Sequence, residues 1–91
     1  MKINSFEWDE ANIIHIEERH GITPEEAEEV FFNRPLFRKT HSGRFIAYGQ
    51  TDEGKYLSVI FLYKPNGVVR VITARDMDSK ECRYYIKERR G

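Results

Sequence analysis

Apolar residues recur along this chain at two different spacings, and the first part of the chain follows the spacing of a helix. Ile13, Ile16 and His20 come at intervals of three and four residues, which places them on one side of a helix. Asp9 precedes this stretch as a favoured N-cap residue, and Gly21 follows it as a favoured helix stop. The pattern therefore predicts a first helix that begins after Asp9 and ends at Gly21.

A second helix is predicted immediately afterwards by the most complete set of signals in the chain. Thr23 suits the N-cap, Pro24 suits the first helical position, and Glu26 three residues after the cap completes a capping box. The helix is expected to end before Pro35, because a residue that precedes proline avoids the helical backbone. Its buried stripe is expected to comprise Ala27, Val30 and Phe31.

From residue 36 the spacing changes to that of strands, which are separated by short turns that contain glycine. Four strands are expected, over residues 36–41, 44–50, 56–63 and 68–75. Connections this short join antiparallel neighbours, so the four strands should form an antiparallel meander. The third and fourth strands are apolar at odd and even positions alike, which indicates that both faces of the sheet centre are covered.

A last helix is predicted after Asp78, which can act as N-cap with Glu81 at the third helical position. The order of elements is thus two N-terminal helices, a four-stranded antiparallel meander and a C-terminal helix. We expect an α+β fold that forms a single domain over residues 1–91. The side of the last helix that can face the sheet comprises Cys82, Tyr85 and Ile86.

The composition fits an ordinary globular protein and excludes several other classes. Of the 91 residues, 40% are hydrophobic and 33% are charged, which argues against both a disordered chain and a membrane protein. No apolar run approaches the roughly 20 residues that span a bilayer, and the first residues lack the pattern of a secretory signal. Cys82 is the only cysteine and cannot form an internal disulfide, which agrees with a reducing compartment. We therefore expect a cytoplasmic protein that makes no contact with a membrane.

The net charge of zero conceals an uneven distribution of charge along the chain. Residues 1–35 hold nine acidic and three basic side chains, whereas residues 36–91 hold six acidic and twelve basic ones. Such a split can present one face to a polyanion and another to water or to a basic partner. The same split arises if each helix merely has a solvated charged face, so composition alone leaves a nucleic-acid partner open.

Several segments of this chain, each weak alone, form a specific combination when they are taken in order. They are Phe6-Glu7-Trp8-Asp9 with His20-Gly21-Ile22, then residues 24–31, and then residues 49–52, 69–75 and 81–85. This combination resembles the BrnT family of bacterial type II toxins, which share the RelE-like fold. The resemblance implies a ribonuclease that arrests translation and an antitoxin of the BrnA type that neutralises it. It further implies that the ribbon-helix-helix domain of the antitoxin binds operator DNA, so that the toxin meets DNA only through its partner.

Cleavage of RNA without a metal needs a base for the ribose 2′-hydroxyl, a cation for the charged phosphorane and an acid for the leaving 5′-oxygen. Arg75, which closes the fourth strand, is the first candidate for the cation, because its planar guanidinium matches phosphate oxygens. A structural salt bridge is the alternative role for Arg75. We expect no metal and no cofactor, because no cysteine or aspartate cluster with metal-ligand spacing surrounds any of the three histidines, His15, His20 and His41.

The last helix supplies most of the other candidate site residues. Glu81 matches a glutamate that BrnT proteins carry in this helix, which implies a general base, but its capping-box position is an equally good structural explanation. Arg83 completes the candidate catalytic set with Arg75 and Glu81. Tyr84 can stack on a base. The expected RNA-binding residues are Arg70, Lys80, Tyr84 and Lys87.

Arg70 is the weaker candidate of the two arginines on the fourth strand. It lies five residues before Arg75 and so has the opposite parity. In a regular strand Arg70 shares a face with Ile72 and Ala74, whereas Arg75 shares the other face with Thr73. The two arginines can serve one pocket only if the strand bends or bulges.

Two other classes of function remain open at this point. The chain can be a non-catalytic member of the same fold that acts only through its antitoxin complex, as a co-repressor or an inactive toxin. It can also be an unrelated small interaction domain whose charge split keeps it soluble. A ribonuclease predicts degraded cellular RNA on expression, a binding protein predicts growth arrest or repression with intact RNA, and an interaction domain predicts neither.

Overall fold

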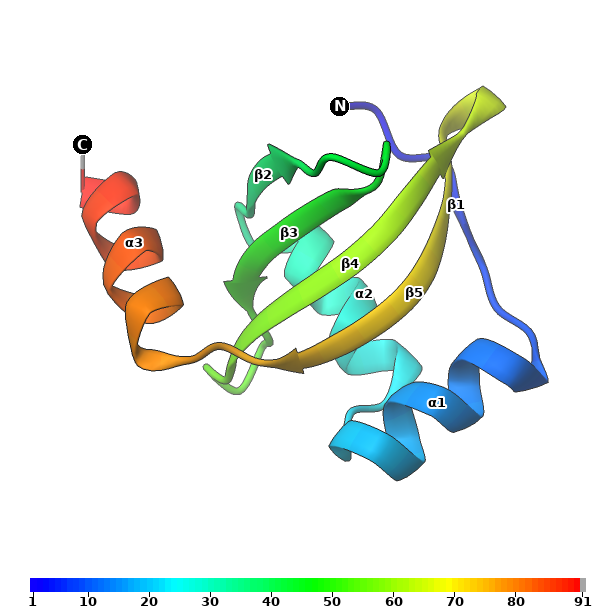
Figure 1. The fold of residues 1–91 in the computed structure, drawn as a ribbon, viewed down its shortest axis with the longest axis horizontal. Coiled ribbons are helices and arrows are strands. Elements are labelled where there is room, and N and C mark those ends of the chain that lie inside the picture. The colour runs from blue at the N-terminus through cyan, green and yellow to red at the C-terminus, as the bar shows by residue number, and fades with distance from the viewer. Residues whose placement is uncertain (91) are drawn as a thin grey trace.

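The computed structural model describes residues 1–90 and places five strands in one sheet with three helices around it (Figure 1). The helices are α1 (Glu10–His20), α2 (Pro24–Phe32) and α3 (Ser79–Arg90), and a 3-10 turn (Pro65–Gly67) joins the last two strands. No helix within residues 1–90 is long and apolar enough to span a bilayer. The strands are β1 (Ser5–Glu7), β2 (Leu36–Lys39), β3 (Phe45–Gln50), β4 (Tyr56–Lys64) and β5 (Val68–Asp76).

The predicted α+β class is confirmed, but the sheet differs from the predicted four-stranded meander. β2, β3, β4 and β5 pair antiparallel in sequence order, as expected. β1 precedes the two N-terminal helices and adds a fifth strand, parallel to β5, so the sheet is mixed and its order is β1-β5-β4-β3-β2. The sequence indicates an extended segment over residues 3–8 but not its place in the sheet, because three paired residues are too few to show alternation and the partner strand lies near the other end of the chain.

Side-chain caps define the helix starts that the sequence predicts. The Asp9 carboxylate accepts the Asn12 backbone N–H at 3.2 Å, and the Asn12 side chain accepts the Asp9 N–H at 2.8 Å. Thr23 and Glu26 form the predicted capping box, with distances of 3.1 and 3.0 Å. Gly21 ends α1 in the left-handed conformation, with φ of 67°. These hydrogen bonds join residues that are three positions apart, which is why the sequence reveals them.

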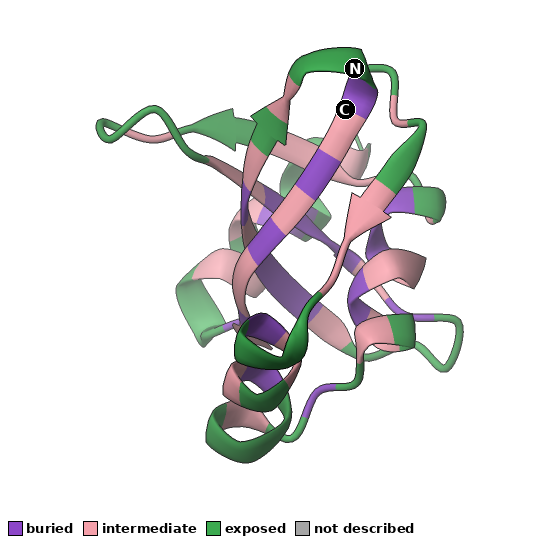
Figure 2. Ribbon diagram, turned by 90° about the vertical axis from the view of Figure 1, so that its right-hand side faces the viewer, coloured by how far each residue is buried: buried purple, intermediate pink, exposed green. Residues whose placement is uncertain are grey.

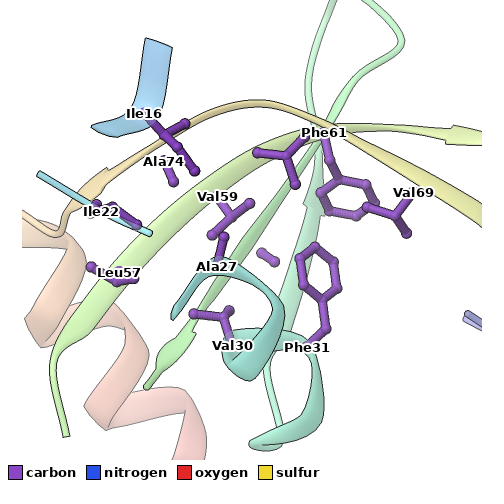
Figure 3. Close-up of a cluster of buried hydrophobic side chains, with 12 residues drawn as sticks. Ile16, Ile22, Ala27, Val30, Phe31, Leu57, Val59, Phe61, Val69 and Ala74 are labelled. Atoms are coloured by element: carbon purple, nitrogen blue, oxygen red, sulfur yellow. The ribbon is translucent and has the colours of Figure 1, made fainter. Parts of the chain in front are cut away.

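One face of the sheet packs against α1 and α2 and forms the main hydrophobic core (Figure 3). Phe61 of β4 is fully buried, and Phe31 of α2 meets it edge-on with ring centroids 5.0 Å apart. Gly49 of β3 lets α2 approach closely, because a Cβ there would lie 3.0 Å from a methyl group of Val30. The other members of this cluster are Ile16, Ile22, Ala27, Ala47, Leu57, Val59, Val69, Val71 and Ala74.

The opposite face of the sheet is covered only at one end, where α3 packs on it. Tyr48, Met77 and Tyr85 form a second, smaller buried cluster there. Ile60 and Leu62 on the same face are half-buried and lie outside this cluster. Buried residues concentrate on the central strands, and exposed residues lie on the outer turns of the helices, in the loops and near the ends of strands (Figure 2). The expectation of two covered faces holds fully for one face and only in part for the other.

A β-bulge in β5 changes which of its side chains share a face. Ile60 of β4 lies opposite Thr73, and the next residue, Phe61, lies opposite Val71. Ile72 is therefore an extra residue in β5 without a partner in β4. The alternation of faces along β5 shifts by one residue at this point.

Because of the bulge, Arg70 and Arg75 point to the same face of the sheet, whereas a regular strand would place them on opposite faces. Arg75 lies opposite Ser58 and Arg70 lies opposite Leu62, and these two residues of β4 point to the same face. The two arginines consequently share the face that carries α3. Ala74 belongs to the main core on the other face. The prediction that Arg70 and Ala74 share a face is wrong, because it assumes a regular strand.

α1 covers the edge of β5 beyond the end of β1. Asn12 is 5% exposed, and its side chain donates to the backbone carbonyls of Glu7 at 3.1 Å and Val71 at 3.0 Å. His15, one turn later, makes a hydrogen bond of 3.1 Å with Thr73. α1 thus supplies a side-chain donor to a β5 carbonyl beside the bulge, where β1 has ended.

We predict that Asn12→Ala lowers the free energy of unfolding by about 1–3 kcal/mol, because it leaves a buried carbonyl without a donor. Urea denaturation followed by Trp8 fluorescence measures the change. Asn4→Ala is the matched control, since the Asn4 side chain donates to an exposed carbonyl of Asn66, and its loss should cost well under about 1 kcal/mol. Equal effects of the two substitutions would show that the Asn12 contact does not stabilise the sheet edge.

Candidate functional site

An ion pair between Arg75 and Glu81 joins the end of β5 to the start of α3. The two terminal nitrogens of the guanidinium donate to the two carboxylate oxygens, at 2.7 and 2.8 Å. The same carboxylate accepts the backbone N–H of Asp78 at 3.0 Å, and the Asp78 side chain accepts the Glu81 N–H at 2.8 Å. Glu81 therefore caps α3 and holds Arg75 at the same time. The predicted capping box and the alternative of a salt bridge for Arg75 are both present.

A hollow of about 360 Å³, which we call the Glu81 hollow, lies against this ion pair. The side chain of Arg75 is 39% exposed and that of Glu81 is 15% exposed, so the pair lies at the surface of the fold rather than inside its core. The sheet register contributes to this arrangement, because Tyr48, Ser58 and Arg75 are neighbours across β3, β4 and β5. The lining residues are Arg38, Tyr48, Asp78, Lys80, Glu81 and Tyr84.

Two tyrosines and an arginine form one wall of the Glu81 hollow. Tyr84 of α3 meets Tyr48 of β3 edge-on, with ring centroids 5.7 Å apart. The guanidinium of Arg38 lies 5.4 Å from the centre of the Tyr84 ring. Arg38 forms no ion pair within residues 1–90, so its charge is available to an anion. An aromatic ring beside an available cation suits a nucleotide.

The pKa values in the Glu81 hollow reflect this crowding of charge. Burial acts to raise the pKa of Glu81, but the hydrogen bonds from Arg75 and from the Asp78 N–H outweigh it and hold that pKa below its ordinary value. The hydrogen bond to Glu81 raises the pKa of Arg75. Burial, reinforced by the negative charge of Glu81, raises the pKa of Tyr48. At neutral pH the hollow holds an ionised carboxylate and a protonated phenol, and the carboxylate is a weak base while Arg75 stays bound to it.

Ser58 adds a polar group between Tyr48 and Arg75. Its side chain is 1% exposed, and its hydroxyl makes no hydrogen bond of regular geometry within residues 1–90. The hydroxyl is nevertheless close enough to Glu81 to help lower the pKa of that carboxyl. A buried hydroxyl without a hydrogen-bond partner is unfavourable. The Ser58 hydroxyl is therefore available to donate to the nearby Glu81 carboxylate.

Two of the predicted residues on α3 lie apart from the Glu81 hollow. Arg83 and Lys87 line another hollow, with Ile86 and Arg90, which we call the outer hollow. Arg83 follows Glu81 by two residues, which turns it toward the opposite side of the helix. The predicted residues that line the Glu81 hollow are Lys80, Glu81 and Tyr84, and Arg75 lies beside it through its ion pair with Glu81.

Arg70 lies at the other end of β5, in a network of ion pairs. It donates to Glu7 of β1 at 3.0 Å and to Asp9 at 2.9 Å, and Lys64 binds the same Glu7 at 2.8 Å. The hydrogen bond to Asp9 raises the pKa of Arg70, and the hydrogen bond from Lys64 lowers that of Glu7 despite partial desolvation. Although the bulge puts Arg70 on the same face as Arg75, the structure does not bring the two together.

Arg38 and Tyr48 are two site residues that the sequence prediction does not include. Nothing in the local sequence distinguishes them from other residues of an amphipathic strand. Arg38 reaches the hollow because β2 pairs with β3, where it lies opposite Ile46. Tyr48 reaches it because β3 pairs with β4, where it lies opposite Ser58. The only signal available in sequence is the alternation of Ile46 and Tyr48, which places both on one face.

No group of three or more His, Cys, Asp or Glu side chains within residues 1–90 is arranged to hold a metal ion. The rings of His15 and His20 lie 5.7 Å apart, edge to face, on α1. The groups that line the Glu81 hollow are two carboxylates, two phenols, the guanidinium of Arg38 and the amine of Lys80, and the Arg75 guanidinium lies against one of the carboxylates.

Comparisons with known proteins identify the family and the fold of the chain. Residues 8–81 match the family model of the ribonuclease toxin BrnT of type II toxin–antitoxin systems. Among solved structures, the chain is similar to the ribonuclease toxin BrnT of Brucella abortus, with 22% sequence identity and a TM-score of 0.71. That similarity covers 82% of this chain and 97% of the Brucella chain, and it shows a shared fold. No curated protein sequence matches the chain.

We predict that the Arg75–Glu81 pair stabilises the protein above the pKa of an unfolded glutamate, about 4.3, and that this stabilisation is lost as the pH falls further. The sign follows from the lowered pKa of Glu81, because the folded protein then binds this proton less readily than the unfolded chain does. Urea denaturation of the wild type and of Glu81→Gln should show a large difference at about pH 7 and a small one at about pH 3.

Glu88→Gln is the matched control for this experiment. It removes the same charge from an exposed position of α3 that takes part in no ion pair within residues 1–90. Its stability relative to the wild type should change little between the two pH values. A Glu81→Gln protein that is equally destabilised at both pH values would contradict the prediction.

Proposed function

The chain belongs to the BrnT family of ribonuclease toxins of type II toxin–antitoxin systems, and from this premise we propose that it cleaves RNA at the Glu81 hollow without a metal ion and so arrests translation. The observation that carries the proposal is the position of the Arg75–Glu81 pair beside an open hollow that Tyr48 also lines. The Arg75 guanidinium matches the cation that metal-free cleavage needs for the phosphorane. The Glu81 carboxylate matches the base, and the protonated phenol of Tyr48 matches the acid.

In the proposed mechanism, a phosphate of the RNA draws the guanidinium of Arg75 away from Glu81. Arg75 then binds two oxygens of the phosphorane and neutralises its charge. Glu81 loses its strongest hydrogen bond that lowers the pKa, so its pKa rises and the carboxylate becomes a better base, while the Asp78 N–H still binds it. The spare hydroxyl of Ser58 donates to Glu81 in this state and keeps the carboxylate in place.

The proposed reaction transfers one proton to the protein and returns one to the product. Glu81 accepts the proton of the ribose 2′-hydroxyl, whose oxygen attacks the phosphorus. The bond from phosphorus to the 5′-oxygen breaks, and Tyr48, which burial keeps protonated, donates its proton to that oxygen. The products are a cyclic 2′,3′-phosphate and a free 5′-hydroxyl.

The remaining predicted residues bind RNA or stabilise the fold in this proposal. Lys80 holds a neighbouring phosphate and Tyr84 stacks on a base, because both line the Glu81 hollow. Arg83 and Lys87 contact the RNA backbone from the outer hollow, so Arg83 binds RNA rather than the reacting atoms. Arg70 remains in its ion pairs with Glu7 and Asp9 and stabilises the β1 edge.

A type II toxin acts with an antitoxin partner, and membership of the family implies such a partner for this chain. We propose that the partner is of the BrnA type, with a ribbon-helix-helix domain that binds operator DNA, and that the toxin reaches DNA only through it. The proposed place of action is the cytoplasm, where the RNA substrate is found and where a free thiol such as Cys82 stays reduced.

A non-catalytic role in an antitoxin complex is the second candidate function. The observation in its favour is that Arg75 already donates both terminal nitrogens to Glu81, so the phosphate clamp is occupied. A protein in which no phosphate displaces Glu81 would act as a co-repressor or an inactive toxin. Total RNA from cells that express the protein distinguishes the two functions, because only the first degrades it.

We predict that Arg75→Ala slows cleavage of a single-stranded RNA by about 10²–10³-fold, because it removes the cation that stabilises the phosphorane. Single-turnover cleavage of labelled RNA, followed on a denaturing gel, measures the rate, and thermal denaturation checks that the variant is folded. Arg44→Ala removes an exposed cation outside the Glu81 hollow and should cleave at the wild-type rate. Full activity of Arg75→Ala would contradict the mechanism, and intact RNA with the wild type would favour the second function.

We also predict that Tyr48→Phe slows cleavage by about 10²-fold with little change in RNA affinity, because it removes the proton donor but not the ring. The pH dependence of the single-turnover rate should lose its alkaline limb in this variant. Tyr84→Phe keeps the stacking ring of the neighbouring tyrosine and serves as the control. An unchanged rate for Tyr48→Phe would exclude the phenol as the general acid.

A further inference from the structure

A third hollow, of about 350 Å³, lies on the flank of α3 that faces away from the Glu81 hollow. The end of α2, the end of β3, the start of β4 and the last turns of α3 form it. It shares no lining residue with the Glu81 hollow, so the mechanism above does not use it. We call it the distal groove, and the lining residues that matter here are Arg34, Tyr56, Tyr85, Ile86, Arg89 and Arg90.

The distal groove concentrates positive charge that the rest of the protein does not neutralise. Arg34, Arg89 and Arg90 line it together, although Arg34 is more than 50 residues from the other two in sequence. None of the three forms an ion pair within residues 1–90. No acidic side chain lines the groove. Three guanidinium groups around one concavity repel each other, and an anion between them removes that repulsion.

The remaining walls of the distal groove are aromatic and apolar. Tyr56 and Tyr85 meet edge-on with ring centroids 6.0 Å apart, and Ile86 is exposed beside them. Tyr85 is buried and belongs to the second core cluster, so it provides a rigid base for the groove. Flat apolar walls between arginines match a nucleotide, which has a base as well as a phosphate, better than they match an inorganic anion.

The backbone of Arg34 supports a specific role for its side chain. Arg34 has a φ of 52°, in the left-handed region that glycine and asparagine adopt more readily than arginine. It connects the end of α2 to Pro35, which begins the passage into β2. Glycine at this position would relieve the strain, so arginine carries a conformational cost here, and it places a guanidinium in the groove.

We propose that the distal groove binds the sugar-phosphate backbone of single-stranded RNA beside the segment that is cleaved. This proposal rests on the proposed ribonuclease function and extends it to a second RNA-binding site. The outer hollow shares Ile86 and Arg90 with the distal groove, which makes the two continuous across the surface of α3. An RNA strand that leaves the Glu81 hollow can therefore pass Arg83 and Lys87 and end between Arg34 and Arg89. The protein selects long single strands over short ones as a result.

Binding of an uncleavable RNA tests the proposal independently of catalysis. The probe is a fluorescent twelve-nucleotide RNA with 2′-O-methyl groups, which lack the attacking hydroxyl, and fluorescence anisotropy measures its Kd at several salt concentrations. The double variant Arg34→Gly with Arg89→Ala removes two cations, and glycine fits the left-handed backbone at residue 34, so the protein should stay folded. We expect the Kd to rise by about 10-fold and the salt slope to fall by about 1.4, at roughly 0.7 per lost phosphate contact.

Lys39→Ala with Arg44→Ala is the matched control, because it removes two exposed cations from the β2–β3 hairpin, outside all three hollows. Its Kd and salt slope should stay close to those of the wild type. Equal losses for the two double variants would overturn the proposal, since they would show only a nonspecific effect of net charge. Wild-type affinity for Arg34→Gly with Arg89→Ala would overturn it as well.

Two further measurements separate this proposal from its alternatives. A twelve-residue oligo-glutamate peptide that displaces the RNA from the wild type, but not from Arg34→Gly with Arg89→Ala, would instead assign the groove to an acidic protein segment.

Cleavage of a trinucleotide should proceed equally in the wild type and the double variant, whereas cleavage of a long RNA should slow in the variant. If the wild type cleaves neither RNA, the proposed function fails, but the anisotropy result still decides whether the groove binds RNA.

Discussion

The carboxylate of Glu81 is the contact on which the geometry of the proposed site depends. It accepts two hydrogen bonds from Arg75 at the end of β5 and one from the backbone N–H of Asp78 at the start of α3. The other contacts between α3 and the sheet come from a small cluster around Tyr48 and Tyr85 and from Arg38, which lies over the Tyr84 ring. The direction of the helix, and with it the opening between α3 and the sheet, therefore depends on a group that is also the proposed base. Structural and chemical roles of Glu81 are thus compatible, because the cap can remain when Arg75 moves to a phosphate.

On one side of the protein, acidic and basic side chains from distant parts of the chain form ion pairs. On the side of α3, the basic side chains of the helix have no such partners within residues 1–90. Glu7, Asp9 and Glu26 from the acidic first third bind Arg70 of β5, Lys64 of β4 and Lys55 of the loop before β4. Each of these exposed pairs contributes little to stability because water screens the charges, but together they neutralise the β1 and α2 side of the molecule. The arginines and lysines of α3 form no such pairs within residues 1–90. A chain with no net charge can in this way present a basic surface to RNA.

The sheet supplies the rigidity that this surface needs. Its main core fills one face with apolar side chains from α1 and α2, which leaves polar side chains on the opposite face free for chemistry. The bulge at Ile72 makes this division possible within a single strand, because it puts Ala74 into the core and Arg75 on the other face. Without the extra residue, Arg75 and Val71 would share a face, and the guanidinium would point toward the core.

Helix boundaries, four of the five strands and the family of the chain can be inferred from the order of amino acids alone. Caps such as Thr23 with Glu26, turn residues and apolar spacing act between residues a few positions apart, so they do not depend on the rest of the fold. Arg75 and Glu81, six residues apart, could be proposed as candidates for the same reason together with the family resemblance. The pairing of β1 with β5, the bulge at Ile72 and the recruitment of Arg38 and Tyr48 depend on strand register instead. Register is set by the packing of residues that are distant in sequence, and a shift of one residue moves a side chain to the other face of the sheet.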